Sequence, residues 1–191
     1  MTLLEQLARS VRSGRLVTYM VNWQTPRTYP TLTATDIAAA EARLGFVLPD
    51  LLRDIYMTIS NGGFGPGYGL LGLRGGAGEP VGNDVYNAID LYEGFRAQQQ
   101  SPRWPEGLLP ICYWGCEIYS CLDCAGPGAP VMAFDPNRKG DGPWRSDCKL
   151  HVNSFSEWLS KWLNDEDLWW SMPLTGEPKF GFEESESAQT H

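Results

Sequence analysis

Four residues in the second half of the chain have the types and the spacing of a zinc site. Two residues separate Cys121 from Cys124, and two separate Cys148 from His151. Thiolate and imidazole pairs at this spacing bind structural zinc. A chelating pair, however, needs both sulfurs on one side of a tight turn. If residues 116–123 form a straight strand, Cys121 and Cys124 point to opposite faces. The interpretation that we favour is buried, reduced thiols and no metal, with zinc binding as the alternative.

Nucleophilic catalysis by cysteine or serine needs a general base, most often histidine. The sequence has two histidines, and His191 is its last residue, which leaves His151. The sequence lacks the G-x-S-x-G, H-E-x-x-H and phosphate-loop motifs. Residues 67–72 match G-x-G-x-x-G, but a helix is predicted before them and a strand after, the reverse of a dinucleotide-binding turn. We therefore expect no catalytic residue, no cofactor and no enzymatic activity. A thiol- or zinc-dependent enzyme is kept as an alternative hypothesis.

The negative charge of the protein is concentrated at its C-terminal end. The net charge is −8, from 23 acidic and 15 basic residues. Residues 165–191 hold seven of the acids and only Lys179, so residues 1–164 carry a net charge of −2. This distribution argues against binding to nucleic acid or a membrane, which would need a basic patch. An acidic segment suits a basic protein partner, or its end is a disordered, solvated tail.

The composition is typical of a globular protein with a real core, because 42% of the residues are hydrophobic and 12% are aromatic. No run of residues approaches the roughly 18 apolar positions that cross a bilayer, and the first residues do not resemble a secretory signal. Five cysteines are an odd number, which does not suit a disulfide framework. We expect a cytoplasmic protein with reduced thiols.

Hydrophobic periodicity predicts helices first, then strands, then one more helix. The helices are expected at residues 2–13, 36–44, 50–60, 84–100 and 155–164, and the strands at 108–114, 116–123, 131–134 and 149–153. Thr33 or Thr35 can cap the second helix, Pro49 suits the first turn of the third, and Ser154 can cap the last. The glycine-rich residues 62–82 are expected to turn the chain into the first strand. This order predicts an α+β fold.

Six residues from two regions are candidate partner contacts: Glu117, Tyr119 and Asp123 in the predicted strand, and Asp165, Trp169 and Trp170 after the last helix. Alternation along the strand sends the first three to one face, together with Cys121. A face with these side chains suits recognition, although a half-solvated sheet has the same pattern. The adjacent tryptophans could anchor an interface. The interpretation that we favour is that they fold back and cover the sheet.

Several short motifs then follow one another in an informative order. The helix around Glu41 ends in Leu44-Gly45, Leu48-Pro49 opens the next helix, and Asn61-Gly62-Gly63 follows it. Residues 109–123, residues 130–134 and residues 155–159 come later, as a hairpin, a strand and a closing helix. This series resembles the SUKH superfamily, also known as the Smi/Knr cell-wall-regulator-like proteins. Each motif alone is weak, but their order over roughly residues 33–163 is specific.

The resemblance implies an α+β fold with a central, largely antiparallel sheet flanked by helices. A SUKH-like core would span residues 33–164, with residues 1–32 packed on it and the acidic residues 165–191 after it. Many bacterial members are immunity proteins that neutralise toxins, often nucleases or deaminases, and others are regulatory interaction modules. We therefore expect an immunity protein that covers the active site of a cognate toxin, or else an interaction scaffold without a toxin partner. Many members carry an aspartate where this chain has Cys116. If that aspartate touches partners in relatives, Cys116 puts the same contact in doubt here.

Overall fold

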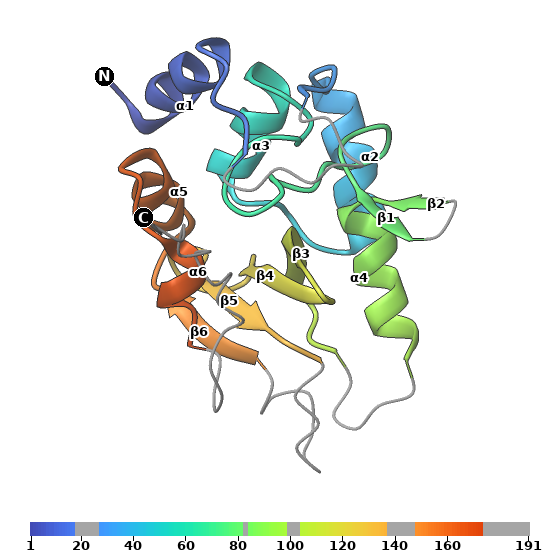
Figure 1. Cartoon of the computed structure of the whole chain (residues 1–191). Coiled ribbons are helices and arrows are strands. Elements are labelled where there is room, and N and C mark those ends of the chain that lie inside the picture. Colours follow the sequence, from blue (N-terminus) through green and yellow to red (C-terminus); the bar gives the residue numbers. More distant parts are fainter. Residues whose placement is uncertain (18–26, 82–83, 99–103, 137–147, 174–191) are drawn as a thin grey trace, which may run out of the picture.

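The computed structural model describes residues 1–17, 27–81, 84–98, 104–136 and 148–173 (Figure 1). Their helices and strands are, in chain order, α1 (Leu3–Arg12), α2 (Ala34–Leu44), α3 (Asp50–Thr58), β1 (Glu79–Val81), β2 (Asp84–Tyr86), α4 (Ala88–Ala97), β3 (Leu108–Gly115), β4 (Ile118–Asp123), β5 (Val131–Phe134), β6 (Cys148–Val152), α5 (Phe155–Leu163) and α6 (Leu168–Ser171). Residues 174–191, which hold most of the predicted acidic segment, lie outside the described residues.

Two antiparallel sheets confirm the predicted α+β class. The main sheet has the order β3-β4-β5-β6, and each strand pairs antiparallel with its neighbour. β1 and β2 form a separate two-stranded sheet. No helix in the described part of the chain is long and apolar enough to cross a membrane.

Side-chain caps explain why the helices begin where they do. Thr2, Thr33 and Asn87 each accept a hydrogen bond from the third residue of the helix that follows, and the side chain of that third residue bonds back to the cap. This reciprocal arrangement satisfies backbone N–H groups that have no partner inside the helix. Thr33, and not Thr35, is therefore the cap of α2. Pro49 occupies the cap position of α3, one residue before the predicted place.

The predicted helix over residues 84–100 is wrong at its beginning. Residues 84–86 form β2, which pairs with β1, and α4 starts only at Ala88. The capping box of Asn87 and Asp90 sets this start. Val85 is consequently 62% exposed, whereas Ile89 and Tyr92 are buried as predicted. Residues 99 and 100 lie outside the described residues.

Helices cover both faces of the main sheet. On one face, the Phe95 ring of α4 contacts the rings of Tyr119 and Phe134 at centroid distances of 5.5 and 5.6 Å. On the other face, Trp169 of α6 lies 5.9 Å from Trp114 of β3. Figure 1 shows α4 to one side of the sheet and α5 with α6 to the other. The strands β3 and β4 are therefore buried on both faces.

Asn61 organises the glycine-rich loop that follows α3. Its side chain is 1% exposed; its Oδ1 accepts a hydrogen bond from the Leu73 amide at 2.8 Å, and its Nδ2 donates one to the Arg74 carbonyl at 3.2 Å. The loop closes so tightly that a Cβ atom on Gly72 or Gly76 would overlap Asn61. The Asn61-Gly62-Gly63 motif therefore has a structural role, because it folds the loop around a buried amide.

The loop then runs along the outer edge of β3. The Leu71 amide donates to the Ile111 carbonyl at 2.8 Å, and the Tyr68 amide donates to the Tyr113 carbonyl at 3.2 Å. Leu70 and Cys112 form an isolated antiparallel bridge. The glycines in residues 67–72 thus let the chain lie against a strand, and a helix does not open after them as phosphate binding would require.

Candidate partner-binding site

The turn between β3 and β4 carries two exposed residues in an unfavourable backbone conformation. Gly115 pairs with Ile118 and encloses a two-residue loop. Both loop residues have positive φ, 50° at Cys116 and 62° at Glu117. Positive φ at both positions is the requirement of a type I′ hairpin turn, for which Asn-Gly is the preferred pair. The chain therefore presents Glu117 to solvent on a turn that its residues do not favour.

A buried carboxylate lies next to this turn. Glu79 of β1 is only 5% exposed, and its Oε2 accepts a hydrogen bond of 2.7 Å from the Tyr119 hydroxyl. Its second oxygen, Oε1, accepts no hydrogen bond from any described residue. Burial raises the pKa of Glu79, the Tyr119 hydroxyl lowers it, and the charge of Glu117 raises it further. The two carboxylates are thus close enough to repel each other.

Three tyrosine rings lie beside Glu79 and the turn between β3 and β4. Tyr68 and Tyr113 are half-buried, and their ring centroids are 5.7 Å apart. Tyr113 and Tyr119 follow at 5.5 Å. Burial raises the pKa of Tyr113, and the charge of Glu79 contributes to the same shift. We call these rings and the two carboxylates the acidic–tyrosine cluster: Glu79, Glu117, Tyr68, Tyr113 and Tyr119.

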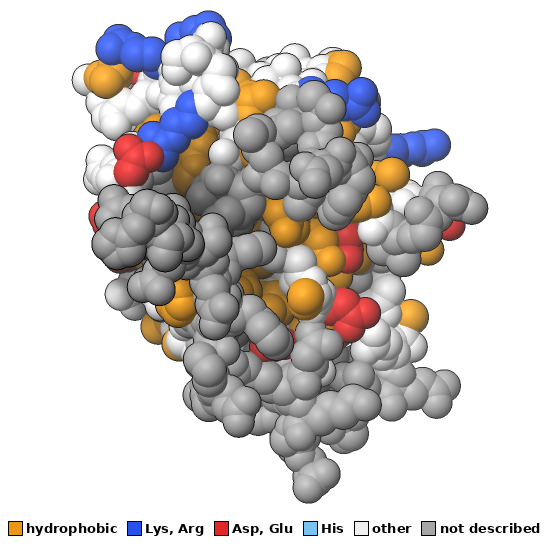
Figure 2. Space-filling view, in the orientation of Figure 1, with side chains coloured by type: hydrophobic (Ala, Val, Ile, Leu, Met, Phe, Trp, Pro, Cys, Tyr) orange, Lys and Arg blue, Asp and Glu red, His pale blue; other side chains and the backbone are white. Residues whose placement is uncertain are grey.

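No cation within the described part of the chain compensates this cluster. The ion pairs between described residues involve other carboxylates, and neither Glu79 nor Glu117 takes part in one. Figure 2 shows acidic side chains beside an apolar area in the middle of the face that it draws. In the same orientation, Figure 1 places β1 and the ends of β3 and β4 in this region. The surface therefore combines apolar and aromatic groups with uncompensated negative charge.

The structure changes the prediction for the face of β4. Tyr119 and Cys121 were expected on a half-solvated recognition face, but they are 4% and 0% exposed. Phe95 of α4 packs on this face and excludes solvent. Of the three contacts predicted on this hairpin, only Glu117 is exposed. Asp123, at the other end of β4, is half-buried and accepts hydrogen bonds from the amides of residues 125 and 126, which holds the next turn.

The second predicted group lies across the sheet. Asp165, whose side chain is 83% exposed, forms an ion pair of 2.8 Å with Arg15. Arg15 also donates hydrogen bonds to the last carbonyls of α5, a position that favours a cation. Trp169 packs on Trp114, which agrees with tryptophans that fold back onto the sheet, whereas Trp170 is 56% exposed. The six predicted residues thus do not form one continuous group.

Sequence reasoning missed Glu79, Tyr68 and Tyr113. Glu79 is the one acid within the glycine-rich residues 62–82, and that isolation was the signal available. Its meaning depends on the hydrogen bond from Tyr119 of β4, which joins residues 40 positions apart. Periodicity within a single strand cannot reveal such a contact.

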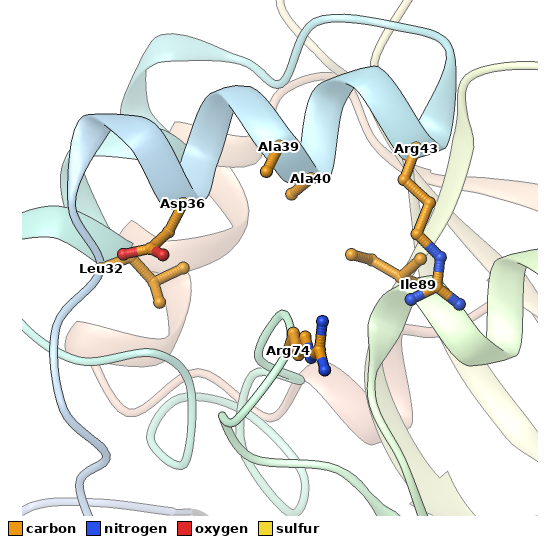
Figure 3. A pocket seen from close by; sticks show the side chains of 7 residues that line it. All are labelled: Leu32, Asp36, Ala39, Ala40, Arg43, Arg74 and Ile89. Carbon is orange, nitrogen blue, oxygen red and sulfur yellow. The ribbon is translucent and has the colours of Figure 1, made fainter.

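A hollow of about 220 Å³ lies elsewhere, between α2 and α4. Its wall is formed by Leu32, Asp36, Ala39, Ala40, Arg43, Arg74 and Ile89, which Figure 3 shows around an open centre. Asp36 is bonded to its cap residue Thr33. Arg43 binds both carboxylate oxygens of Glu93 at 2.7 and 2.6 Å. Because Asp36 and Arg43 are already engaged and Arg74 is the remaining charged side chain of the wall, the hollow is the weaker candidate for recognition.

The thiols of the predicted Cys121–Cys124 pair lie in surroundings that disfavour thiolate chemistry. Cys121 is fully buried, and burial raises its pKa well above the ordinary value. Burial also raises the pKa of Cys124, to about 12. A nucleophile or a zinc ligand must be a thiolate. His151 Nε2 lies 2.9 Å from the Ser171 hydroxyl. Within the described ranges, no three His, Cys, Asp or Glu side chains group to hold a metal ion.

Comparison with known proteins identifies a family for this chain. No curated protein is a significant match to the sequence. A family model described as SMI1 / KNR4 family (SUKH-1) matches residues 31–161, which is more than half of the chain. The matched region begins just before α2 and ends within α5, and so includes the whole main sheet and the acidic–tyrosine cluster. The chain therefore belongs to the SMI1/KNR4 family (SUKH-1).

Proposed function

We propose that this protein binds a bacterial toxin in the cytoplasm and neutralises it by covering its active site. The observation that carries the proposal is the family match over residues 31–161, because the family is known in immunity proteins. Family members are generally non-catalytic immunity or regulatory proteins. The mechanism is then steric: a bound partner keeps the substrate out of the toxin.

The acidic–tyrosine cluster supports a partner with a basic surface. Toxins that act on nucleic acids need a positively charged cleft, because the phosphate backbone dominates their substrate binding. An acidic surface on the inhibitor complements such a cleft and accelerates the encounter. Glu117 is the exposed acid of the cluster, and aromatic rings are the type of side chain that most often anchors an interface.

Trp170, Asp165 and Asp123 remain proposed contacts of the same partner. Trp170 is the large exposed aromatic side chain of α6, and its place across the sheet from Tyr119 would require a partner that reaches around the end of β3. Tyr119 enters the proposal in a different role, since it is buried and positions Glu79 through its hydroxyl.

Co-expression tests the proposal directly. A toxin encoded beside the gene for this protein is expressed in bacteria with and without the full chain, and growth is recorded. The purified proteins are then mixed, and complex formation and toxin activity are measured. We expect restored growth, a stable complex and loss of toxin activity. Absence of a complex together with unchanged toxin activity would refute toxin immunity and favour the scaffold alternative.

A further inference from the structure

We propose that the acidic–tyrosine cluster is the receptor for one arginine side chain of the protein partner. This inference rests on the proposed protein-binding function and adds the chemistry of the central contact. It is carried by the buried Glu79 carboxylate, by the exposed Glu117 beside it, and by the tyrosine rings around them.

The Glu79 carboxylate is the first part of the argument. Glutamate is almost never fully buried unless it is paired, because burying an uncompensated charge is costly. Glu79 is 5% exposed and has the Tyr119 hydroxyl on one oxygen. No Lys, Arg or His side chain in the described ranges forms an ion pair with it, and its Oε1 accepts no hydrogen bond there. A cation from outside would complete this site.

The rings determine which cation fits. A guanidinium is planar, stacks on aromatic faces and presents several N–H donors in a fixed geometry. Tyr113 lies between Tyr68 and Tyr119 in a continuous row. An arginine that enters beside this row can stack on a ring while its N–H groups donate to Glu79 Oε1 and to Glu117. A neutral side chain of the same shape could stack but would leave both carboxylates uncompensated.

The surrounding charges agree with this assignment. Among the described residues, the titratable groups that face Glu79 are Tyr119 and Glu117 of the β4 hairpin and Tyr113 of β3. All are neutral or negative. The charge of Glu117 raises the pKa of Glu79, so the two carboxylates destabilise each other in the absence of a partner. A cation between them would reverse this effect and lower the pKa of Glu79.

Nuclear magnetic resonance tests the site without a partner. N-acetyl-arginine methylamide is titrated into the full chain, and N-acetyl-citrulline methylamide, its neutral isostere, serves as the control ligand. Binding of a single residue is expected to be weak, on the order of millimolar. We expect the arginine amide to shift the resonances of Glu79, Tyr113 and Glu117, and the citrulline amide to leave them unchanged. Equal shifts from both ligands would refute the charge-based site.

Substitutions locate the binding to the cluster. Glu117→Gln and Glu79→Gln each remove one charge and keep the size of the side chain, and the amide oxygen introduced by Glu79→Gln can still accept from Tyr119. Glu106→Gln is the matched control, because Glu106 is exposed and lies outside the cluster. The two cluster variants should abolish the arginine-specific shifts, and the control should retain them. Retained shifts in Glu117→Gln and Glu79→Gln would overturn the proposal.

A toxin identified by co-expression separates the two proposals. If the toxin binds, Glu117→Gln should weaken the complex at least about tenfold, as expected when one member of a buried charge pair is lost, and Glu106→Gln should not. A complex unaffected by both cluster variants would leave toxin binding in place and refute the arginine receptor. If no toxin binds while the arginine amide still binds specifically, toxin immunity fails and the receptor stands.

Discussion

Replacing Cys116 by asparagine and Glu117 by glycine should stabilise the fold and weaken partner binding at the same time. Both residues have positive φ, 50° and 62°. Asparagine tolerates this conformation through its short polar side chain, and glycine has no Cβ to clash. The double variant keeps the two-residue loop between Gly115 and Ile118 and supplies the pair that suits a type I′ turn.

The gain can be worked out from the backbone. A left-handed conformation costs an ordinary L-residue about 1–2 kcal/mol. Glycine at position 117 avoids this cost, but it lowers the stability by about 0.5–1 kcal/mol because it is more flexible in the unfolded chain. Asparagine recovers part of the cost at position 116. The net expectation is about 1 kcal/mol of added stability, which raises the Tm of a chain of this length by about 2–4 °C.

Urea and thermal unfolding measure the effect. The control is the double variant Cys116→Ser with Glu117→Gln, which removes the same thiol and charge but keeps two residues that disfavour positive φ. This control should unfold within about 0.5 kcal/mol of the unaltered protein, as is usual for surface substitutions. The reasoning is refuted if the Asn-Gly variant is no more stable than the control. Both variants should lose the arginine-specific shifts, because both lack Glu117.

Three further changes test separate parts of the structure. Burial raises the pKa of Glu79 above the ordinary value of 4.5, so the native state holds the proton to higher pH than the unfolded state does. As pH rises between the two pKa values, the unaltered protein should therefore lose stability relative to Glu79→Gln, by about 1.4 kcal/mol per unit of pKa difference. Urea titrations from about pH 4 to pH 7 measure this loss, and the opposite slope would contradict it. Tyr56→Phe removes a buried hydrogen bond of 2.6 Å from the Tyr56 hydroxyl to the Leu71 carbonyl. The free energy of unfolding should fall by about 1–3 kcal/mol. A loss below about 0.5 kcal/mol, the range of ordinary surface substitutions, would count against a role of that bond in stability. Gly72→Ala should destabilise the protein by more than about 2 kcal/mol, because the added Cβ has no space. Gly94 lies on the exposed side of α4 with open space around it, so Gly94→Ala should stabilise the protein by about 0.5–1 kcal/mol. A similar result for both glycines in thermal unfolding would contradict the packing argument.

Local signals were sufficient for most helices and strands. Thr33, Gly45 and Ser154 mark helix ends because capping depends on residues within a few positions. The strands of the main sheet agree with the predicted ranges within two residues, since alternation is also a local signal. The predicted beginning of α4 is wrong for a related reason: the apolar period continues through Val85, whereas the capping box at Asn87 sets the start of the helix.

The candidate site was much less accessible to sequence reasoning. Glu117 is predicted because alternation along residues 116–123 places it on one face with Tyr119 and Asp123. Glu79 was not found, because its hydrogen bond to Tyr119 joins residues 40 positions apart. Alternation correctly separates the two faces of β4, but it cannot say which faces α4 will cover, so Tyr119 was expected at the surface and is buried. Contacts of this kind depend on tertiary packing.

The loop along β3 has a consequence for how any partner can attach. The outer strand of a sheet ordinarily offers a row of backbone donors and acceptors, which invites strand addition and aggregation. Here the amides of Leu71 and Tyr68 already occupy carbonyls on that side of β3. A partner at this edge must therefore read side chains and cannot extend the sheet. Its selectivity would then depend on a few side chains at the turn between β3 and β4, which can be substituted without disturbing the backbone pairing beneath them.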